Sequence, residues 1–276
     1  MPTSTRNSKY CACLAACVLC LLLAACNTTG RPQALVTPEP ASTSPVLAEI
    51  IADLRANDDA LKDFRAATTF TLTSPKLKSV QRFTNGSVAY RKPADLRVVG
   101  RNAANMTLFE LKSRGLEFLI EFPPENDVDD RYFCSSEAGD IASAPFRVAP
   151  ADIAHEMFSP IDWSVVKPAD FALDSVNDQT GEATLSVPMQ NGLRRIIVVQ
   201  GKPWRIVHNV LNDATGAPLS DTTMSHYQDI NGVRMPAHVV AEFPGESTHV
   251  EFVLRNLRVN IGIPDNEFYF ECPPGQ

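Results

Sequence analysis

The sequence lacks the short motifs by which several enzyme classes are recognised. It contains no GxSxG elbow, no phosphate-binding P-loop and no GxGxxG turn, and none of its five histidines stands in a close-spaced metal pattern. The acidic run Glu125–Asp130 lacks the glycine and the distal glutamate of an EF-hand, so we interpret it as a solvated loop. We therefore expect no catalytic residues, no metal site and no cofactor, and a protein that is not an enzyme.

Basic charge is also scarce. The chain has 25 lysines and arginines against 32 aspartates and glutamates, which gives a formal net charge of −7. Phosphate binding needs clustered lysine and arginine. The acidic balance therefore argues against nucleic acid as the main partner, and against a broad basic face that binds membranes.

The apolar stretch near the N-terminus, roughly residues 11–25, is shorter than the about 20 residues that span a bilayer. Arg6 and Lys9 precede it, which is typical of an export signal. The stretch ends in Leu23-Ala24-Ala25-Cys26, which resembles the lipobox of bacterial lipoproteins. That resemblance implies cleavage after Ala25 and acylation of Cys26. The alternative is an ordinary signal peptide with a chance cysteine.

The residues that follow predict where the protein is held. Residues 27–45 are rich in Thr, Ser and Pro, so we interpret 26–45 as the lipidated cysteine and a flexible tether. By resemblance to enterobacterial lipoproteins, Asn27 favours the outer membrane. We expect a lipid-anchored protein of the bacterial cell envelope, at the outer membrane and facing the periplasm, with residues 1–25 removed.

Few cysteines remain beyond the anchor. Only Cys134 and Cys272 lie in the expected folded part, and the expected compartment is oxidising. The two can form one disulfide or remain two separate buried thiols, because a sequence does not give the distance between them.

The expected folded part, residues 46–276, begins with a helix. Ser44 and Pro45 supply a cap and a proline at the first helical position, and apolar residues at helical spacing continue to Phe64. A second, short helix is expected within residues 150–163. The rest of the chain has the period of strands.

About ten or eleven strands are expected between turns at regular spacing. The clearest is 116–122, which follows a turn at 113–115, and the last is EFYFE at 267–271. Short links favour antiparallel neighbours, and a sheet this long must curve. The pattern predicts an α+β, mostly β fold: a curved antiparallel sheet that forms an incomplete, or half, barrel with a helical lid.

Apolar side chains on alternate strand positions could line a cavity on the concave face. An ordinary dense core is the alternative, and Trp163 and Trp204 fit either the mouth or the core. The candidate lining residues are Phe70, Leu72, Leu96, Val98, Leu116, Phe118, Ile120 and Phe122.

Several stretches resemble the LolA/LolB-like superfamily, which includes outer-membrane lipoprotein-sorting proteins. They are VLAEIIADLRANDDALKDFRA before the sheet, YRKPADLRVVG, DINGVRMPAHVVAEFP and LRNLRVNIGIPDNEFYF. The recurring marks of the family fall on Pro93, Leu96, Arg97, Gly232, Pro236, Asn260, Pro264, Asp265 and Phe268. The resemblance implies a single domain over 46–276, a half-barrel with a helical lid, and an apolar cavity that takes acyl chains.

Two functions follow as expectations. The first is a membrane-anchored lipoprotein that binds the acyl chains of a lipid or a lipoprotein, in lipoprotein sorting or lipid transfer. The alternative is a non-catalytic signalling or assembly lipoprotein that uses the same fold to bind an envelope protein.

Overall fold

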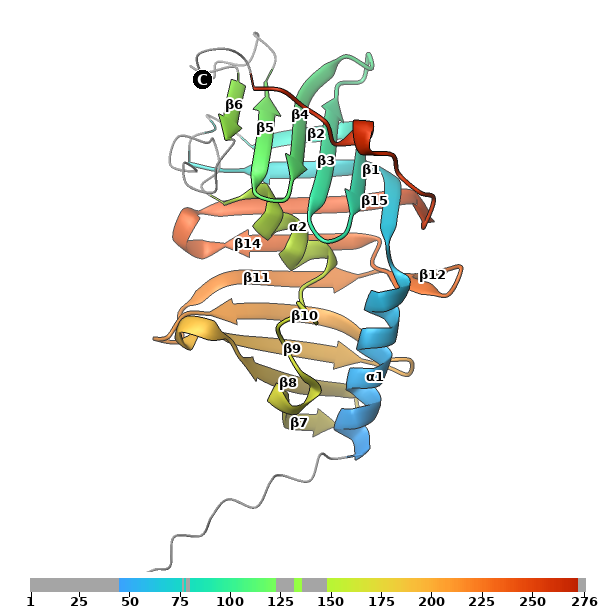
Figure 1. The fold of residues 1–276 in the computed structure, drawn as a ribbon, viewed down its shortest axis with the longest axis vertical. Helices are drawn as coiled ribbons and strands as arrows, with labels where there is room; N and C mark the ends of the chain where they lie inside the picture. Colours follow the sequence, from blue (N-terminus) through green and yellow to red (C-terminus); the bar gives the residue numbers. More distant parts are fainter. Residues whose placement is uncertain (1–44, 76, 78–79, 123–131, 136–147, 273–276) are drawn as a thin grey trace, which may run out of the picture. The chain divides into compact units, whose positions relative to one another are not determined.

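The computed structural model describes residues 45–75, 77, 80–122, 132–135 and 148–272. These residues form one large antiparallel sheet with helices packed against one of its faces (Figure 1). The sheet is curved, and its terminal strands β6 and β7 do not pair with each other, so it does not close into a barrel. The predicted fold class, a half-barrel with helical cover, is therefore confirmed.

Two meanders build the sheet. The first runs through β1 (Asp63–Thr73), β2 (Gln81–Arg91), β3 (Asp95–Arg101), β4 (Thr107–Arg114), β5 (Glu117–Glu121) and β6 (Tyr132–Ser135). The second runs through β7 (Ala172–Asn177), β8 (Glu182–Pro188), β9 (Arg194–Gln200), β10 (Arg205–Asn212), β11 (Pro218–Ser225), β14 (His238–Phe243) and β15 (Thr248–Val259).

The two meanders meet in the middle of the sheet. The strand order is β6-β5-β4-β3-β2-β1-β15-β14-β11-β10-β9-β8-β7, so the last strand of the chain pairs with the first. In this central pair Phe70 lies opposite Phe252 and Leu72 lies opposite Val250. Strands β12 (Gln228–Ile230) and β13 (Val233–Met235) form a separate hairpin, turned by Asn231 and Gly232 with positive φ, as such a turn requires.

Two α-helices cover the concave face. Helix α1 (Pro45–Ala60) buries Leu47, Ile50, Ile51 and Leu54 over β8, β9 and the start of β10. Helix α2 (Pro150–Phe158) packs against β3, β4, β11 and β14. Short 3-10 turns lie at η2 (Pro168–Asp170), η3 (Gln190–Gly192), η4 (Pro244–Glu246) and η5 (Asp265–Glu267). Among the described residues, no helix combines the length and the apolarity needed to cross a membrane.

The first helix ends earlier than predicted. It stops at Ala60, and Phe64 lies in β1 rather than on the helix. The side chain of Asn260 holds this end: its amide donates to the carbonyl of Ala60 at 2.8 Å, and its oxygen accepts from the amide of Lys62 at 2.8 Å. Contacts from a distant segment therefore terminate the helix, although the apolar spacing continues.

The predicted last strand EFYFE is also wrong. Its first residue, Glu267, ends the 3-10 turn η5, and Phe268 is fully buried against Ala89 and Ile263. The guanidinium of Arg91 lies over the Phe268 ring, 4.9 Å from its centroid. One aromatic anchor therefore fixes this segment against the sheet without any strand pairing.

More strands exist than the ten or eleven expected. The described residues contain a 13-stranded sheet and a 2-stranded hairpin. Strands β6, β12 and β13 are too short to show an alternation, and β7 exposes almost all its side chains. Such strands carry no periodic apolar signal in the sequence.

Candidate functional site

The candidate site is the space between α2 and the sheet. Helix α2 begins with Pro150 at its first position, where a missing N–H costs nothing. Its Ile153, Ala154 and Met157 are buried against the sheet. Ile153 and Met157 are four residues apart and therefore lie on the same side of the helix, one turn from each other.

A small cavity remains beneath this helix, which we call the α2 cavity. Its volume is about 20 Å³. That is room for about one water molecule, but a water needs polar partners and every lining side chain is apolar. The lining residues are Phe70, Leu72, Leu96, Val98, Phe109, Leu111, Ile153, Val250 and Phe252.

Seven of the eight predicted lining residues are buried, and four of these line the α2 cavity. Phe70, Leu72, Leu96 and Val98 line the α2 cavity. Phe118, Ile120 and Phe122 are buried in the same core cluster but do not line the cavity.

Leu116 was wrongly assigned to the lining. Leu116 is 59% exposed, because it lies in the turn between β4 and β5, and β5 begins one residue later. The pairing of Arg114 with Glu117 leaves Gly115 and Leu116 as the two turn residues. The alternation that runs through 118, 120 and 122 therefore does not extend to 116.

Aromatic rings fill most of the space around the cavity. The Phe70 ring stacks on Phe83 with centroids 4.4 Å apart and lies 5.5 Å from Phe109. Gly100 permits this arrangement, because a Cβ at that position would lie 2.5 Å from the Phe83 ring. The hollow is thus nearly filled by side chains in this structure.

A buried ion pair ties α2 to the other half of the sheet. Glu156 of α2 and Arg195 of β9 are 4% and 3% exposed. Both terminal nitrogens of Arg195 donate to the carboxylate of Glu156 at 2.8 Å. Asn209 of β10 completes the network: it donates to Glu156 at 2.8 Å and accepts from Arg195 at 2.9 Å.

The electrostatics of α2 follow from this burial. Burial alone would raise the pKa of Glu156, but the hydrogen bonds and charge of Arg195 outweigh it and hold that pKa below its ordinary value. Burial lowers the pKa of His155, and it raises the pKa of Asp152, with the charge of Glu156 adding to that increase. At neutral pH the ion pair is therefore fully charged, beside a neutral imidazole.

An open groove runs along the outer side of α2. Its volume is about 710 Å³, and it contains Asp58, Lys92, His155 and Ser159. The hydroxyl of Ser159 donates to Asp58 at 2.9 Å, and Lys92 pairs with the same carboxylate at 2.6 Å. These contacts join the end of α1 to the end of α2 and to the β2–β3 connection.

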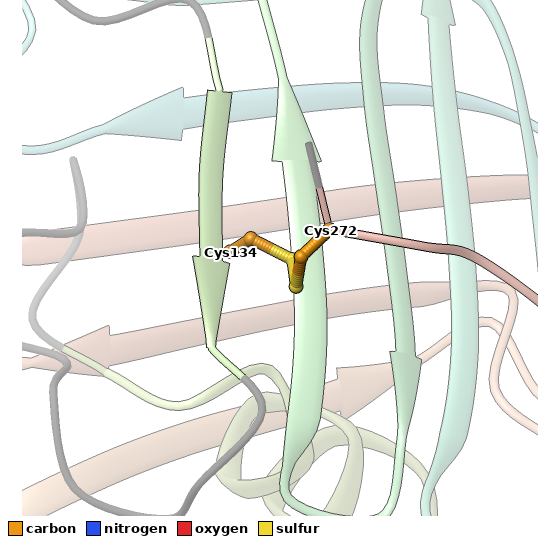
Figure 2. The surroundings of a disulfide bond; sticks show 2 residues. All are labelled: Cys134 and Cys272. Atoms are coloured by element: carbon orange, nitrogen blue, oxygen red, sulfur yellow. A yellow bond between two sulfur atoms is a disulfide. The ribbon is translucent and has the colours of Figure 1, made fainter. Parts of the chain in front are cut away.

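Cys134 and Cys272 are bonded in the structure, as Figure 2 shows. Their Cα atoms are 5.6 Å apart, although 138 residues separate them in the sequence. The bond joins β6, at the edge of the sheet, to the segment that follows η5. Of the two predicted states of these cysteines, the structure contains the disulfide.

Several predicted features lie outside the described residues: the signal peptide 1–25, the lipidation site Cys26, the tether up to residue 44 and the acidic run Glu125–Asp130. Within the residues that the structure describes, no three His, Cys, Asp or Glu side chains lie close enough together to hold a metal ion.

The buried ion pair was missed from the sequence, although a signal for it exists. Arg195 alternates with Ile197 and Val199, so a charged residue occupies an inward position of an apolar strand. An inward charge predicts a buried partner. The partner itself, Glu156, lies 39 residues away and could not be identified from spacing.

No family model and no curated protein sequence matches this chain. Solved structures do match it. A DUF1329 family protein from Desulfovibrio piger aligns with a TM-score of 0.53 and 16% identity, over 82% of this chain and 97% of that one. A LolA superfamily protein from Nitrosomonas europaea aligns with a TM-score of 0.50 and 14% identity, over 80% of this chain and 97% of that one.

These similarities show the fold. The chain has a LolA/LolB-like fold: a half-barrel of antiparallel strands whose concave face is covered by helices. The fold that the sequence resemblance implied is thereby confirmed.

The family marks have structural roles in this fold. Asn260 caps α1, Asp265 pairs with Arg91 at 2.6 Å, and Arg97 pairs with Glu110 and Glu267 at 2.8 and 2.7 Å. They hold the last segment of the chain against the sheet.

Proposed function

We propose that this protein is a membrane-anchored lipoprotein of the bacterial envelope that binds acyl chains of a lipid or a lipoprotein beneath α2. The anchor is Cys26, residues 1–25 are the signal peptide, and residues 26–45 tether the domain that follows. The protein acts without catalysis, in lipoprotein sorting or lipid transfer. Its place is the outer membrane, facing the periplasm.

The observation that carries this proposal is the all-apolar lining of the α2 cavity. Burial of an acyl chain is favoured by roughly 25 cal/mol per Å² of apolar surface and needs no catalytic group. The cavity is also lined by both a helix and the sheet, so displacement of the helix enlarges it.

The volume of about 20 Å³ is far smaller than an acyl chain. A chain can therefore enter only a conformation in which α2 has moved away from the aromatic rings. Ligand binding would select that conformation. The expected signature is slow binding whose rate is limited by opening.

Lipid analysis provides the first test. All described elements lie within 45–272, so a chain that begins at residue 27 retains the whole described fold and lacks Cys26. This chain, exported behind a signal peptide that ends without a lipobox cysteine and purified without a tag from the periplasm, should carry acyl lipid that mass spectrometry identifies after extraction. Protein free of lipid, with no uptake of a fluorescent fatty acid, would contradict the proposal.

A pair of variants locates the binding. Ile153→Phe adds bulk to the α2 cavity and should lower the affinity for a fluorescent fatty acid at least about tenfold. The overpacking should also lower the free energy of unfolding by about 1–3 kcal/mol. Leu116→Phe makes the same kind of change at an exposed turn and should leave affinity unchanged. Equal affinities in the two variants, each with a cooperative thermal transition, would place the ligand elsewhere.

The anchor is tested separately in the full-length chain. Cys26→Ser should move the protein from the membrane fraction to the soluble fraction or leave it unprocessed. Cys17→Ser, which alters the earlier Leu-Ala-Ala-Cys run, should change neither. Membrane association that depends on Cys17 would refute the proposed site.

One observation favours the second candidate, a signalling or assembly lipoprotein that binds an envelope protein. A cavity that serves no ligand is expected to be small, and this one is. A lipid-free protein that elutes together with a partner protein would support this function over the first.

A further inference from the structure

A second cavity lies near the end of α1, and we call it the tryptophan cavity. Its volume is about 60 Å³. The walls come from α1, from the segment that follows α2, and from β10, β11 and β13. Its apolar lining includes Met157, Ile161, Trp163, Trp204, Ile206 and Met224.

Two arginines also line this cavity, and neither forms an ion pair with a carboxylate among the described residues. The Arg234 side chain donates from Nη2 to the carbonyl of Asp53 at 2.9 Å, and its Nε is buried without a hydrogen-bond partner. The guanidinium of Arg205 lies over the ring of Tyr227, 5.6 Å from the centroid. Both side chains are half-buried.

Other arginines of this protein show that a carboxylate partner is available to side chains of similar burial. Arg65, Arg91 and Arg97, which are also partly buried, each pair with a carboxylate at 2.6–2.8 Å. Arg195 does the same in the core. An unpaired charge that loses water is costly, so an anion that reached Arg205 and Arg234 would be favoured.

Acidic groups near the cavity offset only part of the charge of the two arginines. Asp58 lines the cavity but pairs with Lys92 at 2.6 Å. Asp53 does not line the cavity, and its carboxylate accepts from the neutral backbone N–H of Trp204 at 3.0 Å, which leaves its charge in place. The lining residues therefore carry two positive charges against the one negative charge of Asp58, in a chain whose overall charge is negative.

The tryptophan cavity and the α2 cavity lie under the same helix. Met157 of α2 lines the first, and Ile153, one turn earlier, lines the second. Phe158 of the first lies 6.1 Å, centroid to centroid, from Phe252 of the second. Displacement of α2 would join them into one channel, with charge at one end and an apolar aromatic wall at the other.

We propose that the tryptophan cavity receives the anionic head group of the acyl ligand, a carboxylate or a phosphate, with Arg205 and Arg234 as its counterions. The acyl chain then runs beneath α2 into the α2 cavity. This inference rests on the proposed function, and it specifies the ligand as an anionic amphiphile. A guanidinium binds a carboxylate or a phosphate through two parallel hydrogen bonds, which a neutral head group cannot accept as strongly.

Intrinsic fluorescence provides a direct test, because the chain has two tryptophans and both line this cavity. The chain from residue 27 is titrated with 2-bromostearic acid, whose bromine lies next to the carboxyl group and quenches tryptophan on contact. Its methyl ester is the neutral control, and the corresponding brominated lysophosphatidic acid is the phosphate arm. At least one anionic ligand should quench with about tenfold higher affinity than the ester.

Variants assign the head group to the arginines. Arg205→Gln should weaken binding of the anionic ligands about tenfold and leave binding of the ester unchanged. Arg205→Lys keeps the charge but loses the two parallel hydrogen bonds, so it should weaken binding of the anionic ligands less than Arg205→Gln does. Arg258→Gln removes an exposed arginine of β15 and should have no effect. Arg234→Gln should act like Arg205→Gln, provided that its thermal transition is unchanged.

The outcomes separate the two proposals. Equal affinity for acid and ester, or an Arg205→Gln variant that binds like the parent, overturns the head-group assignment but leaves acyl binding intact. Quenching by neither ligand, in a protein that also purifies without lipid, overturns both.

Discussion

The covered face of the sheet has two halves that are packed differently. The aromatic half, on β1–β5 and β15, is filled by Phe64, Phe70, Phe83, Tyr90, Phe109, Phe118, Phe122 and Phe252. The aliphatic half, on β7–β10, is filled mainly by Ala183, Leu185, Val187, Ile197 and Val199 under α1, and its buried rings are Phe171 and Trp204. The α2 cavity lies in the aromatic half.

The difference shows how a cavity can persist in a densely packed core. Branched aliphatic side chains adjust to one another and fill space closely. Large flat rings have few rotamers and specific stacking geometries, so gaps remain where several meet. The α2 cavity lies wholly among residues of the aromatic half or of α2, whereas the tryptophan cavity borders both halves.

Helix α2 lies across the boundary and is held differently on its two sides. Toward the aromatic half it contributes Ile153, Met157 and Phe158, which make only apolar contacts. Toward the second meander it contributes Glu156, which is fixed by Arg195. A ligand that replaces the apolar contacts of α2 with its own would free the helix from the aromatic half. The ion pair would meanwhile hold α2 against the second meander.

The largest expected effect is the loss of that ion pair. Glu156→Gln leaves Arg195 as a buried charge without a counterion and should lower the free energy of unfolding by about 3–5 kcal/mol, measured by urea denaturation. The double variant Glu156→Leu/Arg195→Met removes both charges and should recover part of this loss, because buried Asn209 then loses both partners. If the double variant is as unstable as the single one, the damage comes from packing and not from the unpaired charge.

A matched pair of leucines compares the halves directly. Leu72→Ala beside the α2 cavity and Leu185→Ala in the aliphatic half should each cost about 2–5 kcal/mol, because both side chains are buried. Only Leu72→Ala enlarges an existing cavity, so it alone should raise the affinity for a fluorescent fatty acid. Raised affinity in both variants, or in neither, would remove the distinction between the halves.

The sequence predicted which side chains point inward, but it could not predict whether they line a cavity. The alternation in β5 and the apolar stripe of α1 identified the inward side chains, since burial imposes a period on each element. Dense packing and a cavity produce the same alternation. Whether Phe70 and Leu72 line a hollow depends on which rings meet across strands, and the sequence does not record that.

The misses have a common cause, which is contact between distant residues. Asn260 ends α1 before its apolar stripe stops, and Arg91 with Phe268 holds the last segment outside the sheet. Arg205 and Arg234 lie 29 positions apart in the numbering and meet at one cavity only through the fold. Local patterns carry no information about such pairs.

Acid should weaken the contact of α2 with the second meander. The expected loss in the free energy of unfolding is smaller than in the two variants above. The folded pKa of Glu156 is below its ordinary value of 4.5, so its stabilising contribution is present above that pH and is lost as the pH falls through the folded pKa. His155, with a folded pKa below 6.5, also disfavours the folded state once acid protonates the unfolded chain. Asp152, whose pKa is raised, acts in the opposite direction.

The expected slope is at most about 1.4 kcal/mol per pH unit for each group. Free energies of unfolding measured from pH 7 to pH 3 should fall for the parent protein. They should fall less steeply for Glu156→Leu/Arg195→Met, which lacks the charged pair. Identical slopes in the two proteins would mean that acid acts through other carboxylates.

The smallest effect is expected at Leu116, and it marks the limit of the aromatic half. The side chain lies in the β4–β5 turn outside the core, so Leu116→Ser should change the free energy of unfolding by less than about 0.5 kcal/mol. Phe118→Ala, two residues further along and inside β5, should cost about 3–5 kcal/mol because its ring is buried. Urea denaturation of both variants measures the difference. Similar costs would show that the core of this half extends to the turn, and that Leu116 belongs with the lining residues after all.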